Sequence, residues 1–191
     1  MSNIREYSFK SVSGLSDIFV RSWIPENPSD IKAIIQIAHG MSEYLEYYNW
    51  IAEKLTQAGY VVFANDHIGH GRSVKNDDML GYFGDEDGWM NFIKDQRKVT
   101  EIARKEYPGL PFFTMGHSMG SFISRAYTEI YKDVDGAIYL GTSGPQPTAM
   151  GVMVANLTAK LHGKMYRSPV IEKLHSVHIT LNLNAEQHLI G

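Results

Sequence analysis

The stretch FTMGHSMGS, from Phe113 to Ser121, sets Ser118 between Gly116 and Gly120 in the pattern Gly-x-Ser-x-Gly. An apolar run precedes it and a helical pattern follows, so we expect Ser118 at a sharp turn between a buried strand and a helix. Side chains two positions before and after such a turn would collide with neighbouring elements, and the two glycines remove those collisions. The stretch predicts an exposed nucleophile. The alternative is a serine that only caps an ordinary helix.

Other parts of the chain alternate between strand and helix patterns. Continuous apolar runs, typical of strands buried on both faces of a sheet, are KAIIQIAHG (32–40), YVVFANDH (60–67), PFFTMGH (111–117) and GAIYLGTSGP (136–145). Helical spacing covers 44–59, about 87–107 and the residues after Ser118. Before them, REYSFKSV and DIFVRSWIP predict an antiparallel hairpin. This order predicts an α/β fold with a mostly parallel sheet and helices on both faces.

Composition narrows the class of partner. The chain has 191 residues, 43% of them hydrophobic and 20% charged, as in an ordinary globular domain. With a formal net charge of −3 and no Lys/Arg cluster longer than a pair, we expect no nucleic-acid partner. No apolar run approaches the roughly 18 residues of a membrane span, and the first residues lack a signal-peptide pattern. We therefore expect no membrane span and a cytoplasmic location.

We expect neither a cofactor nor a metal. The chain has no cysteine, which excludes disulfides and thiolate metal sites. His67 and His70 have a metal-like spacing, but both belong to the turn DHIGHG, whose glycines let it fold tightly. Gly69-x-Gly71 begins like a dinucleotide fingerprint, yet Val74 stands where its third glycine should be.

A nucleophilic serine also needs donors for the oxyanion that forms when it attacks a carbonyl. The backbone N–H of Met119 would lie at a helix N-terminus beside Ser118. The loop after strand 32–40 lies at the carboxyl end of the sheet, where open α/β sheets bind ligands. The N–H of Met41 in that loop is the candidate second donor. We expect His117 to point to the opposite side of the sheet and to be a packing residue.

Three separated motifs carry a family resemblance: IAHGMSEY (37–44), NDHIGHGRS (65–73) and TMGHSMGS (114–121). In order and spacing they resemble the α/β-hydrolases, and specifically the monoacylglycerol lipase and lysophospholipase group, which is also grouped with serine aminopeptidases of the S33 type. The resemblance runs from the first hairpin to about Leu174. It implies that Ser118 is the nucleophile, that Met41 and Met119 form the oxyanion hole, and that the substrate is a small-molecule acyl ester, either an acyl ester of glycerol or a lysophospholipid. Tyr44 replaces a histidine of many relatives, which leaves the acyl preference open.

The resemblance also divides the chain. It implies a core over 1–145, the start of a cap over 146–174, and a tail over 175–191 that is unlike the family. In the cap, apolar residues recur at helical spacing, and they either face an acyl chain or pack on the sheet: Met150, Met153, Val154, Leu157 and Leu161. We expect substrate contacts from His39 and Gly40 in the oxyanion loop, and from Met150 and Met153 in the cap.

The acid and the base of a catalytic triad come after the nucleophile in this fold, in the order aspartate then histidine. The tail histidines come too early for that role, as does the one in the cap: His162, His175, His178 and His188. We therefore expect the triad Asp and His to be absent from this chain, with the last strands missing. With suitable synonymous codons, the tail read one base earlier gives AFGSYN and FDWL, segments typical of relatives. This suggests that a single-base deletion near the Leu174 codon produced the tail.

These features predict a serine hydrolase of acyl esters, of monoacylglycerol or lysophospholipid type, whose activity in this chain is impaired. One alternative is a non-catalytic fragment or acyl-binding module, and another is an aminopeptidase of the same fold. The strand at 136–140 would lie at an uncovered sheet edge, which favours self-association.

Overall fold

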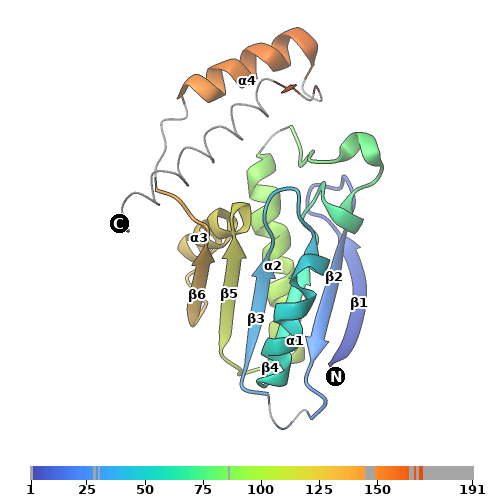
Figure 1. Cartoon of the computed structure of the whole chain (residues 1–191), viewed down its shortest axis with the longest axis vertical. Helices are drawn as coiled ribbons and strands as arrows, with labels where there is room; N and C mark the ends of the chain where they lie inside the picture. Colours follow the sequence, from blue (N-terminus) through green and yellow to red (C-terminus); the bar gives the residue numbers. More distant parts are fainter. Residues whose placement is uncertain are drawn as a thin grey trace, which may run out of the picture. The chain divides into compact units, whose positions relative to one another are not determined.

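The computed structural model describes residues 2–27, 29, 31–85, 87–144, 149–163, 166, 168 and 169. They form one six-stranded sheet with the strand order β1-β2-β4-β3-β5-β6 (Figure 1). The strands are β1 (Asn3–Lys10), β2 (Asp17–Ile24), β3 (Ala33–Ala38), β4 (Tyr60–Asn65), β5 (Phe112–His117) and β6 (Gly136–Leu140).

The pairing of the strands matches the two expected kinds of sequence pattern. β1 and β2 form the antiparallel hairpin, and β2 pairs antiparallel with β4. The continuously apolar strands β3, β4, β5 and β6 run parallel to one another. Since parallel strands share one carboxyl edge, the loops after β3 and β5 emerge side by side, with Ala38 opposite Gly116 in the register.

Helices cover both faces of the sheet. α1 (Asn49–Gln57), preceded by the 3-10 turn η2 (Leu45–Tyr48), packs on one face, where Leu45 and Ala52 belong to the same core as Ile35. α2 (Gly88–Glu106) and α3 (Met119–Tyr131) pack on the other face, in the core that contains Ile34. Because successive strand residues point to opposite faces, Ile34 and Ile35 belong to different cores. The predicted α/β-hydrolase architecture, with its N-terminal hairpin, is confirmed. Two further 3-10 turns, η3 (Gly71–Ser73) and η4 (Asp77–Met79), lie between β4 and α2.

β6 lies at an edge of the sheet. Its sequence is typical of a buried strand, yet Ile138 is 47% exposed and Leu140 45% exposed.

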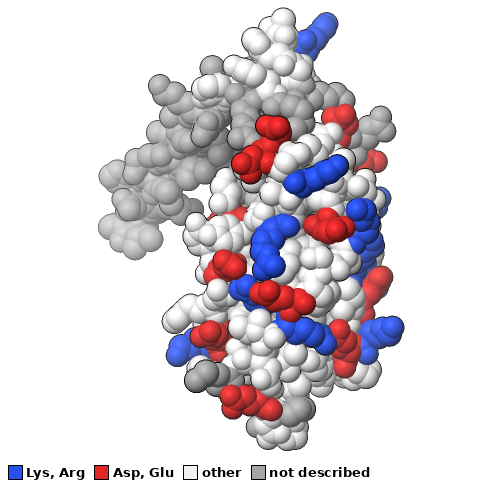
Figure 2. Space-filling model, turned by 90° about the vertical axis from the view of Figure 1, so that its right-hand side faces the viewer, with Lys and Arg blue, Asp and Glu red and all other residues white. Residues whose placement is uncertain are grey.

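On the face of the molecule in Figure 2, Lys and Arg are interspersed with Asp and Glu rather than gathered in one patch.

Residues Ser143–Gly191 form a second compact unit. Within it the structure describes helix α4 (Ala149–His162), which lies in the expected cap segment. The side chains of Met153, Leu157 and Leu161 are exposed along this helix. The expected tail, 175–191, lies outside the described residues.

Candidate active site

Ser118 occupies the turn between β5 and α3. Its backbone has φ 49° and ψ −117°, a conformation that a residue with a side chain adopts only at a cost. β5 ends at His117 and α3 begins at Met119, as a displayed nucleophile requires. Ser118 stands at the N-cap position, but its side chain makes no capping hydrogen bond. This geometry favours the nucleophile over the helix cap.

The two glycines that flank Ser118 lie where no side chain fits. A Cβ on Gly116 would lie 2.2 Å from the carbonyl oxygen of Gly120. A Cβ on Gly120 would lie 2.1 Å from the carbonyl oxygen of Ala38. The first turn of α3 is therefore pressed against the end of β3.

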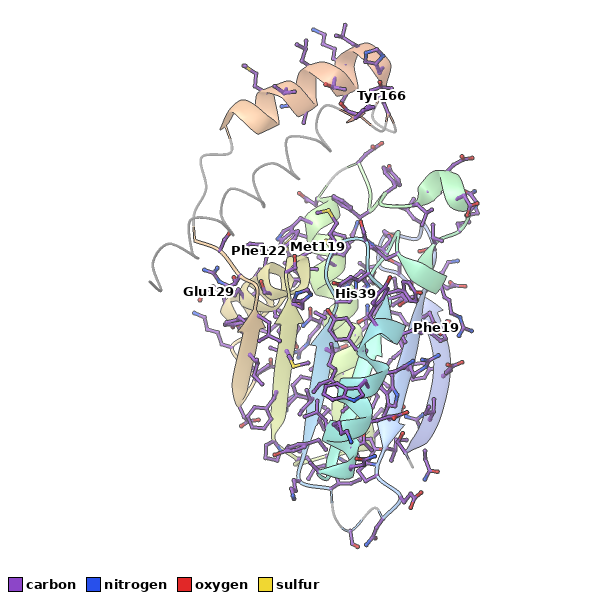
Figure 3. All side chains as sticks on the ribbon, viewed as in Figure 1. Phe19, His39, Met119, Phe122, Glu129 and Tyr166 are labelled. Carbon is purple, nitrogen blue, oxygen red and sulfur yellow. The ribbon has the colours of Figure 1, made fainter. Side chains whose placement is uncertain are left out.

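The loop after β3 (residues 39–43), which is the expected oxyanion loop, lies beside this turn. A Cβ on Gly40 would lie 3.2 Å from Nδ1 of His117, so Gly40 contacts the residue just before Ser118. Figure 3 shows His39 and Met119 near the same end of the sheet. The N–H groups of Met41 and Met119 donate no hydrogen bond to any residue that the structure describes. Their role as oxyanion donors stays a prediction.

Glu43 holds this loop against the turn. Its Oε2 accepts hydrogen bonds from the N–H of Gly40 at 2.8 Å and from the hydroxyl of Tyr48 at 2.7 Å. Nδ1 of His117 lies 3.3 Å from the same oxygen. Burial alone would raise the pKa of the Glu43 carboxyl, but the hydrogen bonds from Tyr48 and Gly40 hold it below its ordinary value. Glu43 thus stays ionised and ties the oxyanion loop to the residue before the nucleophile.

The expectation that His117 is a packing residue was wrong. Its side chain is 41% exposed and faces Glu43 instead of packing into a core. Strand alternation still holds here: Phe113 and Met115 belong to the core that contains Leu45, and His117 lies on the same face of the sheet, beside Glu43.

His39 is the first residue of the oxyanion loop, and its side chain is buried. The residue is 1% exposed; its Nδ1 lies 2.7 Å from the Gly40 carbonyl oxygen, and its Nε2 accepts the His67 N–H at 2.9 Å. Burial lowers the pKa of His39 to about 4, so the ring is neutral near pH 7. Sequence reasoning placed His39 at the substrate; the geometry favours support of the loop.

Asp66, another residue that sequence reasoning missed, fixes the turn after β4. Its carboxylate accepts the N–H of Leu45 and the N–H of Arg72, each at 2.7 Å. It joins the start of η2 to the DHIGHG turn, where His67 and His70 pack against Phe92. Among the residues that the structure describes, no group of three potential metal ligands occurs.

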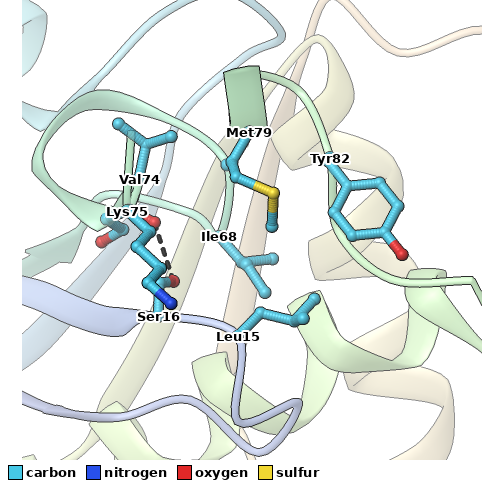
Figure 4. Close-up of a pocket in the computed structure, with 9 residues that line it drawn as sticks. Leu15, Ser16, Ile68, Val74, Lys75, Met79 and Tyr82 are labelled. Carbon is cyan, nitrogen blue, oxygen red and sulfur yellow. Dashed lines mark hydrogen bonds between the residues drawn. The ribbon is translucent and has the colours of Figure 1, made fainter. Parts of the chain in front are cut away.

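The other predicted substrate contacts stay predictions. Met153 lies in α4 and is 65% exposed, but α4 belongs to the second unit. Met150 lies in the same helix, and its side chain is outside the described part. A small hollow near Leu15, Ile68 and Tyr82, with a cavity volume of about 10 Å³, does not include Ser118 (Figure 4). It is smaller than the roughly 300 Å³ at which ligand pockets begin.

No described residue makes a hydrogen bond to the hydroxyl of Ser118. His162 lies in α4, in the second unit, and His175, His178 and His188 lie outside the described residues. The absence of the triad Asp and His from this chain stays a prediction.

The strand order and the strained serine at the strand-to-helix turn are those of an α/β-hydrolase. The chain belongs to the family described as serine aminopeptidase, S33, whose model matches residues 29–187. This match runs past Leu174 into the segment that we expected to differ, and the change of reading frame there stays a prediction.

Several proteins of known name are similar to this chain in sequence. A monoacylglycerol lipase of Mycolicibacterium smegmatis is 34% identical over 173 residues, which are 88% of this chain and 57% of that protein. Human monoglyceride lipase is 36% identical over 107 residues, 56% of this chain and 33% of that protein. A thermostable carboxyl esterase from Bacillus coagulans, solved in complex with glycerol, has a TM-score of 0.75 and 32% identity, over 86% of this chain and 52% of that one. The matched part therefore spans between 33% and 57% of the length of these relatives.

No helix among the described residues is long and apolar enough to cross a membrane. The compartment in which the protein works stays a prediction.

Proposed function

We propose that the protein is a serine hydrolase of acyl esters. The observation that carries this proposal is the strained backbone of Ser118, which stands at the strand-to-helix turn next to Met119 and near the loop that carries Met41. A helix cap needs no such strain, whereas a displayed nucleophile does.

In the proposed reaction, the Ser118 hydroxyl oxygen attacks the ester carbonyl carbon and its proton passes to a base. The N–H groups of Met41 and Met119 donate hydrogen bonds to the oxyanion that forms. Collapse of this intermediate expels the alcohol and leaves an acyl-serine, which water then hydrolyses. Within the first unit, no described histidine hydrogen-bonds to the Ser118 hydroxyl, and we infer from the expected absence of the triad Asp and His that turnover by this chain is slow.

The proposed substrate is a monoacylglycerol or a lysophospholipid. Support comes from the names of the matched relatives, two of which are monoacylglycerol lipases, and from an esterase relative that was solved with glycerol. A panel of p-nitrophenyl esters and aminoacyl anilides tests the class. Hydrolysis of esters alone supports the proposal, and hydrolysis of anilides alone supports the aminopeptidase that the family description allows.

A second candidate function is an acyl-binding module without turnover. The absence of a hydrogen-bond partner for the Ser118 hydroxyl among the described residues favours it. Binding of a fluorescent fatty acid by a chain that hydrolyses no ester would select this alternative.

We also infer that the chain self-associates through β6. This edge strand exposes Ile138, Tyr139 and Leu140, and its outer backbone groups have no strand partner among the described residues. Light scattering after size exclusion should give a mass above that of the monomer, and Ile138→Lys should shift it toward the monomer. A monomer at every concentration would contradict this inference.

A further inference from the structure

The side chain of His39 holds the peptide unit between Gly40 and Met41. Nδ1 of His39 lies 2.7 Å from the Gly40 carbonyl oxygen, and Nε2 lies 2.9 Å from the backbone nitrogen of His67. The His67 N–H can only donate, so Nε2 must accept. In the neutral ring the proton is then on Nδ1, and it is donated to the Gly40 carbonyl.

This hydrogen bond fixes a group on the other side of the same peptide unit. The described peptide bonds include no cis bond, so the Gly40 carbonyl and the Met41 N–H point in opposite directions within one plane. Because the carbonyl points toward the buried ring of His39, the Met41 N–H must point away from it. Gly40 also contacts His117, which places this peptide unit next to the Ser118 turn.

We propose that His39 is a positioning residue that orients the Met41 N–H through the Gly40 carbonyl. The proposal rests on the proposed function, because only there is the Met41 N–H an oxyanion donor. His39 itself touches no substrate in this role, since its ring is buried and both of its nitrogens have partners.

Little else holds the carbonyl. Its other described partner is the N–H of Glu43, at the longer distance of 3.4 Å. On the other side of Gly40, the Glu43 carboxylate accepts the Gly40 N–H at 2.8 Å. That bond fixes the peptide before Gly40, not the peptide after it. Without the donor on His39, the Gly40–Met41 peptide can therefore rotate.

Two amide variants separate the two hydrogen bonds of the ring. In His39→Asn, the side-chain N–H can take the place of Nδ1 and still donate to Gly40. In His39→Gln, the side-chain oxygen can take the place of Nε2 and still accept from His67, but the donor to Gly40 is lost. Both replacements are neutral, so a difference between them reports the lost bond and not the charge.

The first readout does not depend on activity. Ring ¹⁵N chemical shifts of the parent chain should show His39 with a protonated Nδ1 and an unprotonated Nε2. The amide ¹H and ¹⁵N shifts of Met41 should stay close to the parent values in His39→Asn and move in His39→Gln. A ring protonated on Nε2, or a Met41 amide that moves equally in both variants, would overturn the proposal.

The second readout is the rate at which an alkyl fluorophosphonate labels Ser118. Loss of an oxyanion donor costs a hundred-fold or more, so His39→Gln should be slowed at least about ten-fold, while His39→Asn stays within about three-fold of the parent. If the labelling rate fell equally in both variants, and in proportion to their loss of thermal stability, the role of His39 would be merely structural. If the parent itself is not labelled, the proposed function fails, and the ring and amide shifts still decide the role of His39.

Discussion

Gly120 at the start of α3 and Ala38 at the end of β3 are in direct contact, since a Cβ on Gly120 would lie 2.1 Å from the Ala38 carbonyl oxygen. This contact holds the turn that displays Ser118 against the strand that leads into the oxyanion loop. The site is thus built where two parallel strands end, and it depends on backbone packing before any side chain takes part.

Gly120→Ala should therefore destabilise the fold. The added methyl group must push backbone apart, which costs about 1–3 kcal/mol or more in the free energy of unfolding. Gly144→Ala is the matched control, because a Cβ on Gly144 meets no atom within 4 Å. Urea denaturation measures both variants. Equal stability of the two would contradict the close contact.

Ser118→Gly should make the chain more stable. Glycine adopts the backbone angles of Ser118 without the strain that a side chain brings, and relief of that strain offsets the greater chain entropy of glycine. We expect a gain of about 1 kcal/mol over Ser118→Ala, which keeps the Cβ. A Ser118→Gly chain that unfolds at lower denaturant concentration than Ser118→Ala would show that the turn is unstrained.

Glu43→Ala should loosen the oxyanion loop. It removes the acceptor for the Gly40 N–H and the Tyr48 hydroxyl, and hydrogen bonds to a charged group contribute about 1.5–3 kcal/mol each. We expect lower stability and faster hydrogen exchange at Gly40. Glu43→Gln keeps one oxygen acceptor and should lie between the parent and Glu43→Ala. The role of Glu43 fails if hydrogen exchange at Gly40 is unchanged in Glu43→Ala.

Stability should fall as the pH drops from about 6.5 toward about 4. The pKa of His39 is about 4 in the folded chain and 6.5 in the unfolded chain. Between these pH values the unfolded state therefore takes up a proton that the folded state does not bind, which favours unfolding. The loss is on the order of 3 kcal/mol. Burial lowers the pKa of His67 too, which adds to the same trend.

The carboxyl of Glu43 contributes to the pH dependence of stability over a different pH range. Its pKa lies below 4.5 in the folded chain, so its contribution is complete above that pH and is lost only at more acid pH. Denaturation curves at a series of pH values separate the two effects, and His39→Asn should reduce the slope between pH 6.5 and 4. An unchanged slope in that variant would assign the trend to other groups.

The sequence alone was enough to predict the strands, the hairpin and the turn at Ser118, because the apolar runs and the glycine spacing are local signals. The parts that sequence reasoning missed depend on contacts between distant segments. Glu43 reaches His117 across 74 positions of the chain, and Nε2 of His39 meets the backbone of His67. A buried histidine and a loop glutamate have no spacing that reveals such partners, so their roles became visible only in the fold.

Peptide mass spectrometry after prolonged exposure to an alkyl fluorophosphonate tests most directly whether Ser118 is the displayed nucleophile. Prolonged exposure allows for slow reaction without a histidine base. We predict one adduct, on the peptide that contains Ser118, and none there in Ser118→Ala. Adducts spread over several serines, or a Ser118 that stays unlabelled while another serine reacts, would contradict the account.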